Sequence, residues 1–172
     1  MVEAVATRKE DKLRGLLASL NSVVVSFSGG VDSSYLLKIA HDVLGDNAIA
    51  ATGLSQTYAP EEMEEAHVVA RDIGAEYVLV DTAELTDPRY ADNTHQRCFF
   101  CKSELYGKLV DLARQREIQW VIDGSNADDL DDFRPGMRAA RDLGVRSPLQ
   151  EVGMTKAEIR VQSAFHGLRT WD

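Results

Sequence analysis

The stretch that most constrains how this chain folds is residues 23–34, which read Val-Val-Val-Ser-Phe-Ser-Gly-Gly-Val-Asp-Ser-Ser. A β-branched apolar run leads into a Gly-Gly pair, and an amphipathic segment follows at residues 35–40. Strands favour β-branched residues, and glycines mark tight turns. The stretch therefore predicts a strand, a tight loop and the start of a helix.

The predicted loop has the composition of a phosphate-binding site. Glycines allow a ligand to approach the main chain closely, and the unpaired N–H groups of the next helical turn favour an anion. An ordinary glycine-rich turn is the alternative interpretation. We predict nucleotide contacts throughout the loop, and we expect Asp32 to be catalytic and to ligate magnesium. The predicted nucleotide-binding residues are Ser28, Gly29, Gly30, Asp32, Ser33 and Ser34.

Two common nucleotide motifs are missing from the sequence. The ATPase P-loop requires a Lys after its second glycine, and none follows Gly30; no Gly-x-Gly-x-x-Gly occurs either. The string Ser-Gly-Gly-Val-Asp-Ser-Ser instead resembles the PP-loop of the ATP pyrophosphatase superfamily. That resemblance implies that the loop holds the β- and γ-phosphates while ATP is cleaved between its α- and β-phosphates.

The overall charge restricts the class of partner. The chain has 172 residues and a formal net charge of −9. Broad nucleic-acid binding requires a basic surface, so we expect no nucleic-acid partner. No apolar run is long enough to span a membrane, and we expect a cytoplasmic protein without a membrane partner.

Apolar periodicity predicts the order of the elements. Helices are expected at residues 3–20, from the glycine turn to about residue 44, at 60–73 and at 102–116. Strands are expected in the apolar run that begins at Val23 and at 48–54, 77–80 and 120–122. A final helix is expected to begin with a capping box of Thr155 and Glu158. This alternation predicts an α/β fold, with a doubly wound parallel sheet in three α/β/α layers.

Further ligand contacts are expected where strands end, because ligands of doubly wound sheets bind at that rim. After the second strand we expect Gly53, Leu54 and Ser55 to meet adenine or ribose. After the fourth, Gly124 and Ser125 are expected at the α-phosphate and ribose. Asp128 is a candidate catalytic residue that serves magnesium or the substrate. The alternative interpretation of the acidic run 123–132 is a solvated loop, which is at least as good an interpretation for Asp131 and Asp132.

Cysteine and arginine clusters complete the candidate site. Cys98-x-x-Cys101 suggests cluster ligands, a redox pair or incidental thiols, and His95 is a further candidate ligand. Four arginines follow the acidic run and either recognise an anionic substrate or pair with the aspartates. They are Arg134, Arg138, Arg141 and Arg146.

The combination of motifs resembles the LarE family, the ATP-dependent sacrificial sulfur transferases of nickel-pincer cofactor synthesis for lactate racemase. The matching strings include residues 28–34, 97–102, 123–129, 134–136, 147–149, 154–160 and 170–172. The resemblance implies an adenine nucleotide alpha hydrolase-like PP-loop domain. It also implies ATP-dependent conversion of a carboxylate of a pyridinium dicarboxylate mononucleotide to a thiocarboxylate.

The same resemblance implies ATP and magnesium as cofactors, and substrate contacts at Arg97, Asn126 and Arg134. In some family members a protein cysteine gives up its sulfur. In others cysteines hold a [4Fe-4S] cluster, for which Cys98 and Cys101 are the candidate ligands here.

The family sequence continues past Thr-Trp-Asp, whereas this one stops at Asp172. We therefore expect residues 1–172 to be the PP-loop ATP pyrophosphatase domain, with the family's C-terminal domain and sulfur-transfer cysteine absent. A homo-oligomer is expected. Three alternatives stay open: an ammonia-dependent synthetase, a tRNA thiolase and a nucleotide-binding module without catalysis.

Overall fold

The computed structural model describes residues 1–54, 59–82, 97–131 and 135–172, without the side chains of residues 2, 97–99, 131 and 135. The elements in chain order are α1 (Val2–Leu20), β1 (Val23–Ser26), α2 (Val31–Leu44), η1 (Gly45–Asn47), β2 (Ala48–Leu54), α3 (Pro60–Ile73), β3 (Glu76–Asp81), α5 (Arg97–Gln115), β4 (Trp120–Ile122), η3 (Ala127–Asp131), α6 (Pro135–Asp142), α7 (Pro148–Glu151) and α8 (Lys156–Phe165). The four strands pair in parallel in the order β3-β2-β1-β4. The predicted parallel α/β sheet is therefore confirmed.

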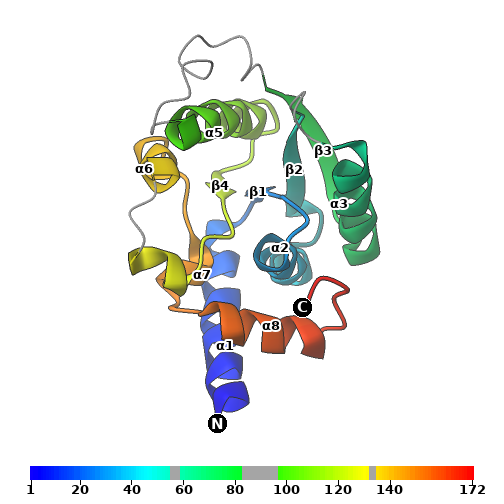
Figure 1. Cartoon of the computed structure of the whole chain (residues 1–172), viewed down its shortest axis with the longest axis vertical. Helices are drawn as coiled ribbons and strands as arrows, with labels where there is room; N and C mark the ends of the chain where they lie inside the picture. The colour runs from blue at the N-terminus through cyan, green and yellow to red at the C-terminus, as the bar shows by residue number, and fades with distance from the viewer. Residues whose placement is uncertain (55–58, 83–96, 132–134) are drawn as a thin grey trace.

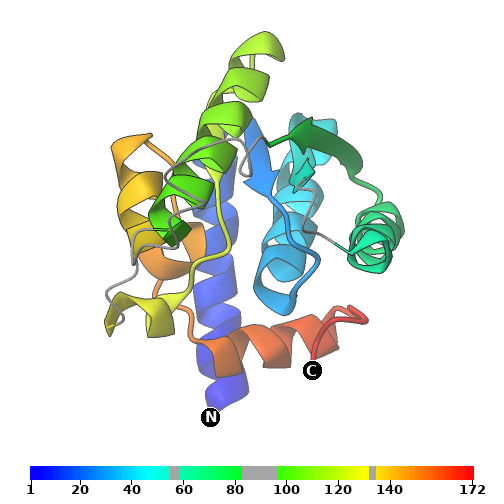
Figure 2. The same cartoon turned by 45° about the horizontal axis from the view of Figure 1, so that its top comes forward.

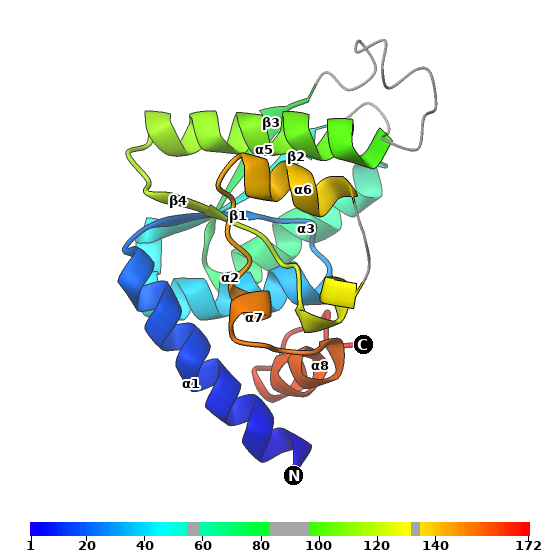
Figure 3. The ribbon, with the colours of Figure 1, turned by 90° about the vertical axis from the view of Figure 1, so that its left-hand side faces the viewer.

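The sheet separates two hydrophobic cores, because successive strand side chains point to opposite faces. Val23 and Val25 pack with apolar residues of α1, α2, α3 and α8. Val24, between them, packs with those of α5 and α6. Figure 3 shows α5 and α6 above the sheet, and α1, α2 and α8 below it. The three predicted α/β/α layers are confirmed.

The last helix returns to the first two. Figures 1 and 2 both show α8 crossing α1 and lying near α2. Its N-cap is Thr155, whose hydroxyl accepts from the Glu158 amide while the Glu158 carboxylate accepts from the Thr155 amide. This capping box was predicted, and it fixes where α8 begins.

One predicted boundary is wrong. Helix α5 begins at Arg97 rather than at Lys102, so the Cys-x-x-Cys motif lies inside its first turns. The residues between these positions include neither glycine nor proline, so no residue there breaks a helix. The helix packs through Tyr106 and Leu109, and it can therefore extend back to Arg97. Within the described ranges, no helix is both long and apolar enough to cross a membrane.

Candidate functional site

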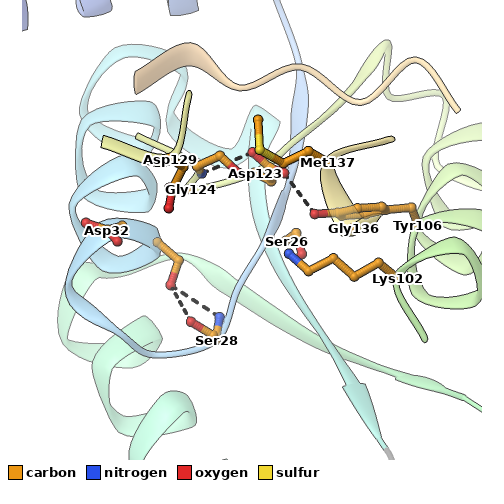
Figure 4. Close-up of a pocket in the computed structure, with 12 residues that line it drawn as sticks. Ser26, Ser28, Asp32, Lys102, Tyr106, Asp123, Gly124, Asp129, Gly136 and Met137 are labelled. Atoms are coloured by element: carbon orange, nitrogen blue, oxygen red, sulfur yellow. Dashed lines mark hydrogen bonds between the residues drawn. The ribbon is translucent and has the colours of Figure 1, made fainter. Parts of the chain in front are cut away.

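The strand order creates a crevice between β1 and β4. Strand β1 is followed by α2 on one face of the sheet, whereas β4 is preceded by α5 on the other. Ligands of doubly wound sheets bind at the carboxyl ends of strands at such a switch point. A cavity of about 420 Å³ lies there and is shown in Figure 4. Its lining residues are Ser26, Ser28, Asp32, Ser33, Lys102, Tyr106, Asp123, Gly124, Ser125, Asp129, Gly136 and Met137.

The loop that follows β1 is closed by its own hydroxyls. Gly30 is the N-cap of α2. The Ser33 hydroxyl accepts from the Ser28 amide at 3.2 Å and lies 3.1 Å from the Ser28 hydroxyl, which in turn accepts from the Gly30 amide at 3.3 Å. The loop thus presents hydroxyls beside the N-terminus of α2, the end of a helix that attracts anions.

Two glycines allow neighbouring segments to approach this loop. Gly29 has φ +79°, a left-handed conformation, and a Cβ there would lie 3.1 Å from Ala66 of α3. A Cβ on Gly124 would lie 3.0 Å from the Ser33 amide nitrogen in the first turn of α2. Gly124 therefore brings the segment after β4 against the first turn of α2, where its predicted ligand contact stays a prediction.

Asp32, in the first turn of α2, joins three segments. Its Oδ2 accepts from the Lys156 ammonium and from Asn126 Nδ2, the latter at 3.4 Å. Its Oδ1 is buried and has no hydrogen-bond partner among the described residues. Lys156 was not among the predicted site residues. The sequence did contain a signal, because Lys156 directly follows the N-cap of α8. The helix dipole disfavours a cation at that position unless an anion lies nearby.

Asp32 also fits a magnesium ion that arrives with a nucleotide. Magnesium is usually held by one or two carboxylates together with substrate phosphates and water. The unpartnered Oδ1 of Asp32 is available for this, and Asp129 lines the same cavity. Among the described residues no group of three or more His, Cys, Asp or Glu side chains could hold a metal alone. The arrangement suits an ion held mainly by phosphate oxygens.

Asp123, directly after β4, organises the centre of the cavity. This carboxylate is 5% exposed. It accepts from the Tyr106 hydroxyl at 2.8 Å, the Ser147 hydroxyl at 2.7 Å and the Ser125 amide at 3.1 Å. Burial of the Tyr106 hydroxyl, together with the nearby Asp123 charge, raises the pKa of Tyr106 far above its ordinary value. Tyr106 is therefore a neutral donor that fixes Asp123.

Two other polar residues of this segment mainly hold the backbone. The Asp128 carboxylate accepts from the Lys156 amide at 2.8 Å and is not among the cavity-lining residues. Asn126 is buried, donates to Asp32 and accepts from the Asp128 amide at 2.9 Å. The proposed ligand roles of Asp128 and Asn126 stay predictions beside these structural contacts.

The end of β2 is occupied by protein contacts. A Cβ on Gly53 would lie 2.9 Å from Leu105 of α5, and the Leu54 carbonyl accepts from the Thr82 amide at 3.1 Å. Neither Gly53 nor Leu54 lines the cavity in Figure 4. Their contacts with adenine or ribose stay predictions, and Ser55 lies outside the described residues.

The predicted cysteine and arginine sites are described in part. His95 and Arg134 lie outside the described residues, as do the side chains of Arg97 and Cys98. Cys101 is half-buried in α5. A [4Fe-4S] cluster normally takes more thiolates than the two cysteines of this chain, so these residues alone do not fit one.

None of the described arginines after the acidic run is among the residues that line this cavity. Arg146 donates to Glu151 with its Nε and Nη2, and its guanidinium lies over the Trp120 ring, 5.2 Å from the centroid. Arg138 lies 3.8 Å from Asp142 in α6. For Arg146 this geometry favours the acid-paired interpretation over substrate recognition.

Known proteins with similar sequences share this framework. The family model described as NAD synthase matches residues 5–106. The pyridinium-3,5-bisthiocarboxylic acid mononucleotide synthase of Lactiplantibacillus plantarum is 35% identical over 170 residues, covering 98% of this chain and 62% of its own length. An uncharacterized protein of Synechocystis is 46% identical over 164 residues, which is 95% of this chain and 61% of that protein. The chain thus spans about three fifths of the length of these curated relatives.

Solved structures resemble this one at the level of fold. The NH3-dependent NAD synthetase of Campylobacter jejuni aligns with a TM-score of 0.72 at 18% identity, covering 98% of this chain and 75% of that one. The U34-tRNA thiolase NcsA of Methanococcus maripaludis, solved with its [4Fe-4S] cluster, aligns with a TM-score of 0.73 at 16% identity, covering 97% and 66%.

Proposed function

Because this chain belongs to the NAD synthase family, we propose that it binds ATP at residues 28–34 and uses it to adenylate a carboxylate. The support is geometric: a hydroxyl-lined loop, a helix N-terminus and Asp32 all meet one cavity at the switch point of the sheet. We further propose that residues 1–172 act as a PP-loop ATP pyrophosphatase domain, the ATP-binding portion of a sulfur transferase.

The proposed acceptor is a pyridinium dicarboxylate mononucleotide. One observation carries this choice, the 35% identity to a pyridinium-3,5-bisthiocarboxylic acid mononucleotide synthase over nearly the whole chain. A carboxylate oxygen of the acceptor attacks the α-phosphorus of ATP, and the bond from that phosphorus to the bridging oxygen breaks. Pyrophosphate leaves with the electron pair, and the acceptor becomes an acyl-adenylate.

Described side chains divide the work of this step. The loop hydroxyls and the N-terminus of α2 hold the terminal phosphates, while Asp32 orients the Lys156 ammonium toward them. Magnesium, when bound beside Asp32, offsets charge that develops on pyrophosphate. Asp123 stays hydrogen-bonded to Tyr106 and keeps the residues after β4 close to the loop.

A sulfide would then attack the acyl carbon and displace AMP to give a thiocarboxylate. A cysteine thiolate would instead give a thioester, and loss of the cysteine Cα proton with cleavage of its Cβ–S bond would release the thiocarboxylate and leave dehydroalanine. Cys98 and Cys101 are candidate participants, either as thiols or as two ligands of a cluster completed by a further thiolate. The cluster in the U34-tRNA thiolase NcsA supports that second possibility by analogy of fold alone. We propose the cytoplasm as the compartment, because it keeps such thiols reduced.

The experiment that tests the proposal follows pyrophosphate. The purified chain is incubated with MgATP, with and without pyridine-3,5-dicarboxylate mononucleotide, and pyrophosphate and AMP are quantified. We expect pyrophosphate release only when the acceptor is present. Equal release with and without the acceptor, or none at all, would contradict the proposed function.

Parallel acceptors separate this proposal from its nearest rivals. NAD synthetases and a tRNA thiolase are among the structural neighbours, so nicotinate adenine dinucleotide with ammonia and unmodified tRNA are tested alongside. A net charge of −9 disfavours tRNA. If MgATP binds but no acceptor releases pyrophosphate, a nucleotide-binding module without catalysis is the better description.

We also propose that the chain forms a homo-oligomer. Phe165, at the end of α8, is 76% exposed, and Trp171 is 48% exposed. Exposed aromatic groups of this kind favour association with another surface. Sedimentation velocity should show a species larger than the monomer, and replacement of Phe165 by Ser should shift it to the monomer; a wild-type monomer would contradict this proposal.

A further inference from the structure

Lys102, on α5, is the single cationic side chain among the described residues that line the nucleotide cavity. The acidic residues of the same lining are Asp32, Asp123 and Asp129. Figure 4 shows the lysine side chain extending across the cavity with its ammonium toward Ser26, on the side opposite Asp32. Lys102 therefore supplies positive charge on a wall that the phosphate loop does not form.

No ion pair neutralises Lys102 within the part of the chain that the structure describes. Its recorded contact is with the Tyr106 ring, whose centroid lies 5.8 Å from the ammonium nitrogen. A cation over an aromatic face keeps its charge and remains able to bind an anion. Lys156 differs, because it is paired with Asp32 beside the phosphate loop.

Gly136, at the start of α6, makes room for this lysine. A Cβ at Gly136 would lie 2.6 Å from Cδ and 3.1 Å from Cε of Lys102. Gly136 is not among the glycines with positive φ, so its backbone would accept an alanine. Glycine is needed at this position because a larger residue would clash with the Lys102 side chain, which passes beneath α6.

We propose that Lys102 binds the acceptor carboxylate as it meets the α-phosphate of ATP, and that Gly136 is the positioning residue for that ammonium. This inference rests on the adenylation proposed above. The carboxylate and the nucleotide are both anionic and repel each other as the new P–O bond forms. The ammonium lowers that repulsion and keeps its own protons throughout, and pyrophosphate leaves with the electron pair of the broken bond.

The groups proposed to hold the triphosphate lie on another side of the site. The loop hydroxyls, the N-terminus of α2 and Lys156 lie together at the Asp32 side. Lys102 reaches the cavity from α5, across from them (Figure 4). Its loss should therefore affect the acceptor far more than ATP.

Lys102→Ala tests the binding role. We expect kcat/KM for the dicarboxylate mononucleotide, measured as pyrophosphate release, to fall by about tenfold to a hundredfold, the range for one charged hydrogen bond. The calorimetric Kd for MgATP should change less than about twofold. Lys108→Ala is the matched control, since Lys108 is an exposed lysine of the same helix that does not line the cavity.

Gly136→Ala tests the positioning role. It should lower the same kcat/KM without lowering the melting temperature, because the lysine side chain can move away and alanine favours a helix. Combined with Lys102→Ala it should cause no further loss, since the group that it displaces is already gone. Gly107→Ala in α5 is the control, because a Cβ there meets nothing within 4 Å.

The outcomes separate the two proposals. A wild-type chain without acceptor-dependent pyrophosphate release overturns the proposed function, and this inference with it. An active wild type with unchanged kcat/KM in Lys102→Ala overturns the inference alone. Fully additive losses in the double variant would remove Gly136 from its positioning role, and an equal loss of MgATP affinity would reassign Lys102 to the nucleotide.

Discussion

The ammonium of Lys156 is paired with the carboxylate of Asp32, although 124 positions separate the two residues in sequence. Each lies in the first turn of a helix, Lys156 in α8 and Asp32 in α2. The pair therefore places a cation beside two helix N-termini, at the edge of the phosphate loop. Since helix dipoles disfavour a cation there, the position of Lys156 suggests that it binds an anionic ligand as well as Asp32.

Lys156→Met should weaken ATP binding much more than it destabilises the fold. A partly exposed ion pair contributes less than about 1 kcal/mol to the free energy of unfolding. Loss of a cation at the phosphates should raise the Kd for MgATP by about tenfold or more. Lys38→Met is the control, because it removes the Lys38–Asp42 pair of α2, away from the cavity lining. Equal ATP affinity in both variants would exclude a phosphate contact for Lys156.

Asp32→Asn should separate binding from chemistry. The amide retains the size of the side chain but loses the charge that holds Lys156 and would ligate magnesium. We expect pyrophosphate release to fall by at least about tenfold, with a much smaller change in the Kd for AMP. Unchanged pyrophosphate release would remove Asp32 from the mechanism.

Gly124→Ala should damage the site through the backbone. A Cβ there would lie 3.0 Å from the amide nitrogen of Ser33, so α2 or the segment after β4 must shift. We expect a loss of about 1–3 kcal/mol in the free energy of unfolding, with weaker ATP binding. Gly15→Ala in α1 meets no atom within 4 Å and should instead stabilise the protein by about 1 kcal/mol. Urea unfolding compares the two, and equal effects would contradict this packing argument.

Glu10 of α1 makes stability depend on pH. Burial by itself raises the pKa of Glu10, but hydrogen bonds from His166, Tyr35 and Arg14 outweigh burial and hold this pKa below its usual 4.5. Because the folded-state pKa is lowered, the stabilisation is fully present above about pH 4.5. It is lost as the pH falls through the lowered folded-state value.

Glu10→Gln should remove part of that acid sensitivity and cost about 3 kcal/mol at pH 7, since it breaks a buried charge cluster. Urea unfolding at pH 7, 5, 4 and 3 measures both effects. Glu3→Gln, at an exposed position of the same helix, is the control and should change little. A wild-type stability that is constant from pH 7 to pH 3 would contradict the assigned role of Glu10.

Local patterns predicted most of the fold and only part of the site. The β-branched run before Ser28, the glycine turn and the Thr155 capping box act within a few residues, so their structures follow from the sequence nearby. The contacts of Lys156 with Asp32 and of Gly136 with Lys102 join distant segments. The position of Lys156 after an N-cap indicates that it needs an anion, but no local pattern identifies Asp32 as that anion or Lys102 as the neighbour of Gly136. These contacts arise only when the sheet brings the segments together.

The predicted start of α5 failed for a related reason. The helix was expected to begin at Lys102, directly after the Cys-x-x-Cys motif, yet a helix that packs through Tyr106 and Leu109 extends back to Arg97. Asp123 was grouped with a solvated acidic run, although it is buried with three donors. Burial of a single residue in such a run depends on tertiary neighbours that composition does not reveal.

The central claim is that residues 28–34 hold the phosphates of ATP, and calorimetric titration of MgATP tests it most directly. Wild-type chain and Gly30→Val are compared, because a Cβ at Gly30 meets only the Ser28 hydroxyl at 3.4 Å and the fold should survive. We predict saturable binding by the wild type and a loss of at least about tenfold in affinity in Gly30→Val, whose side chain would fill the phosphate position. Equal ATP affinity in two folded proteins would contradict the account.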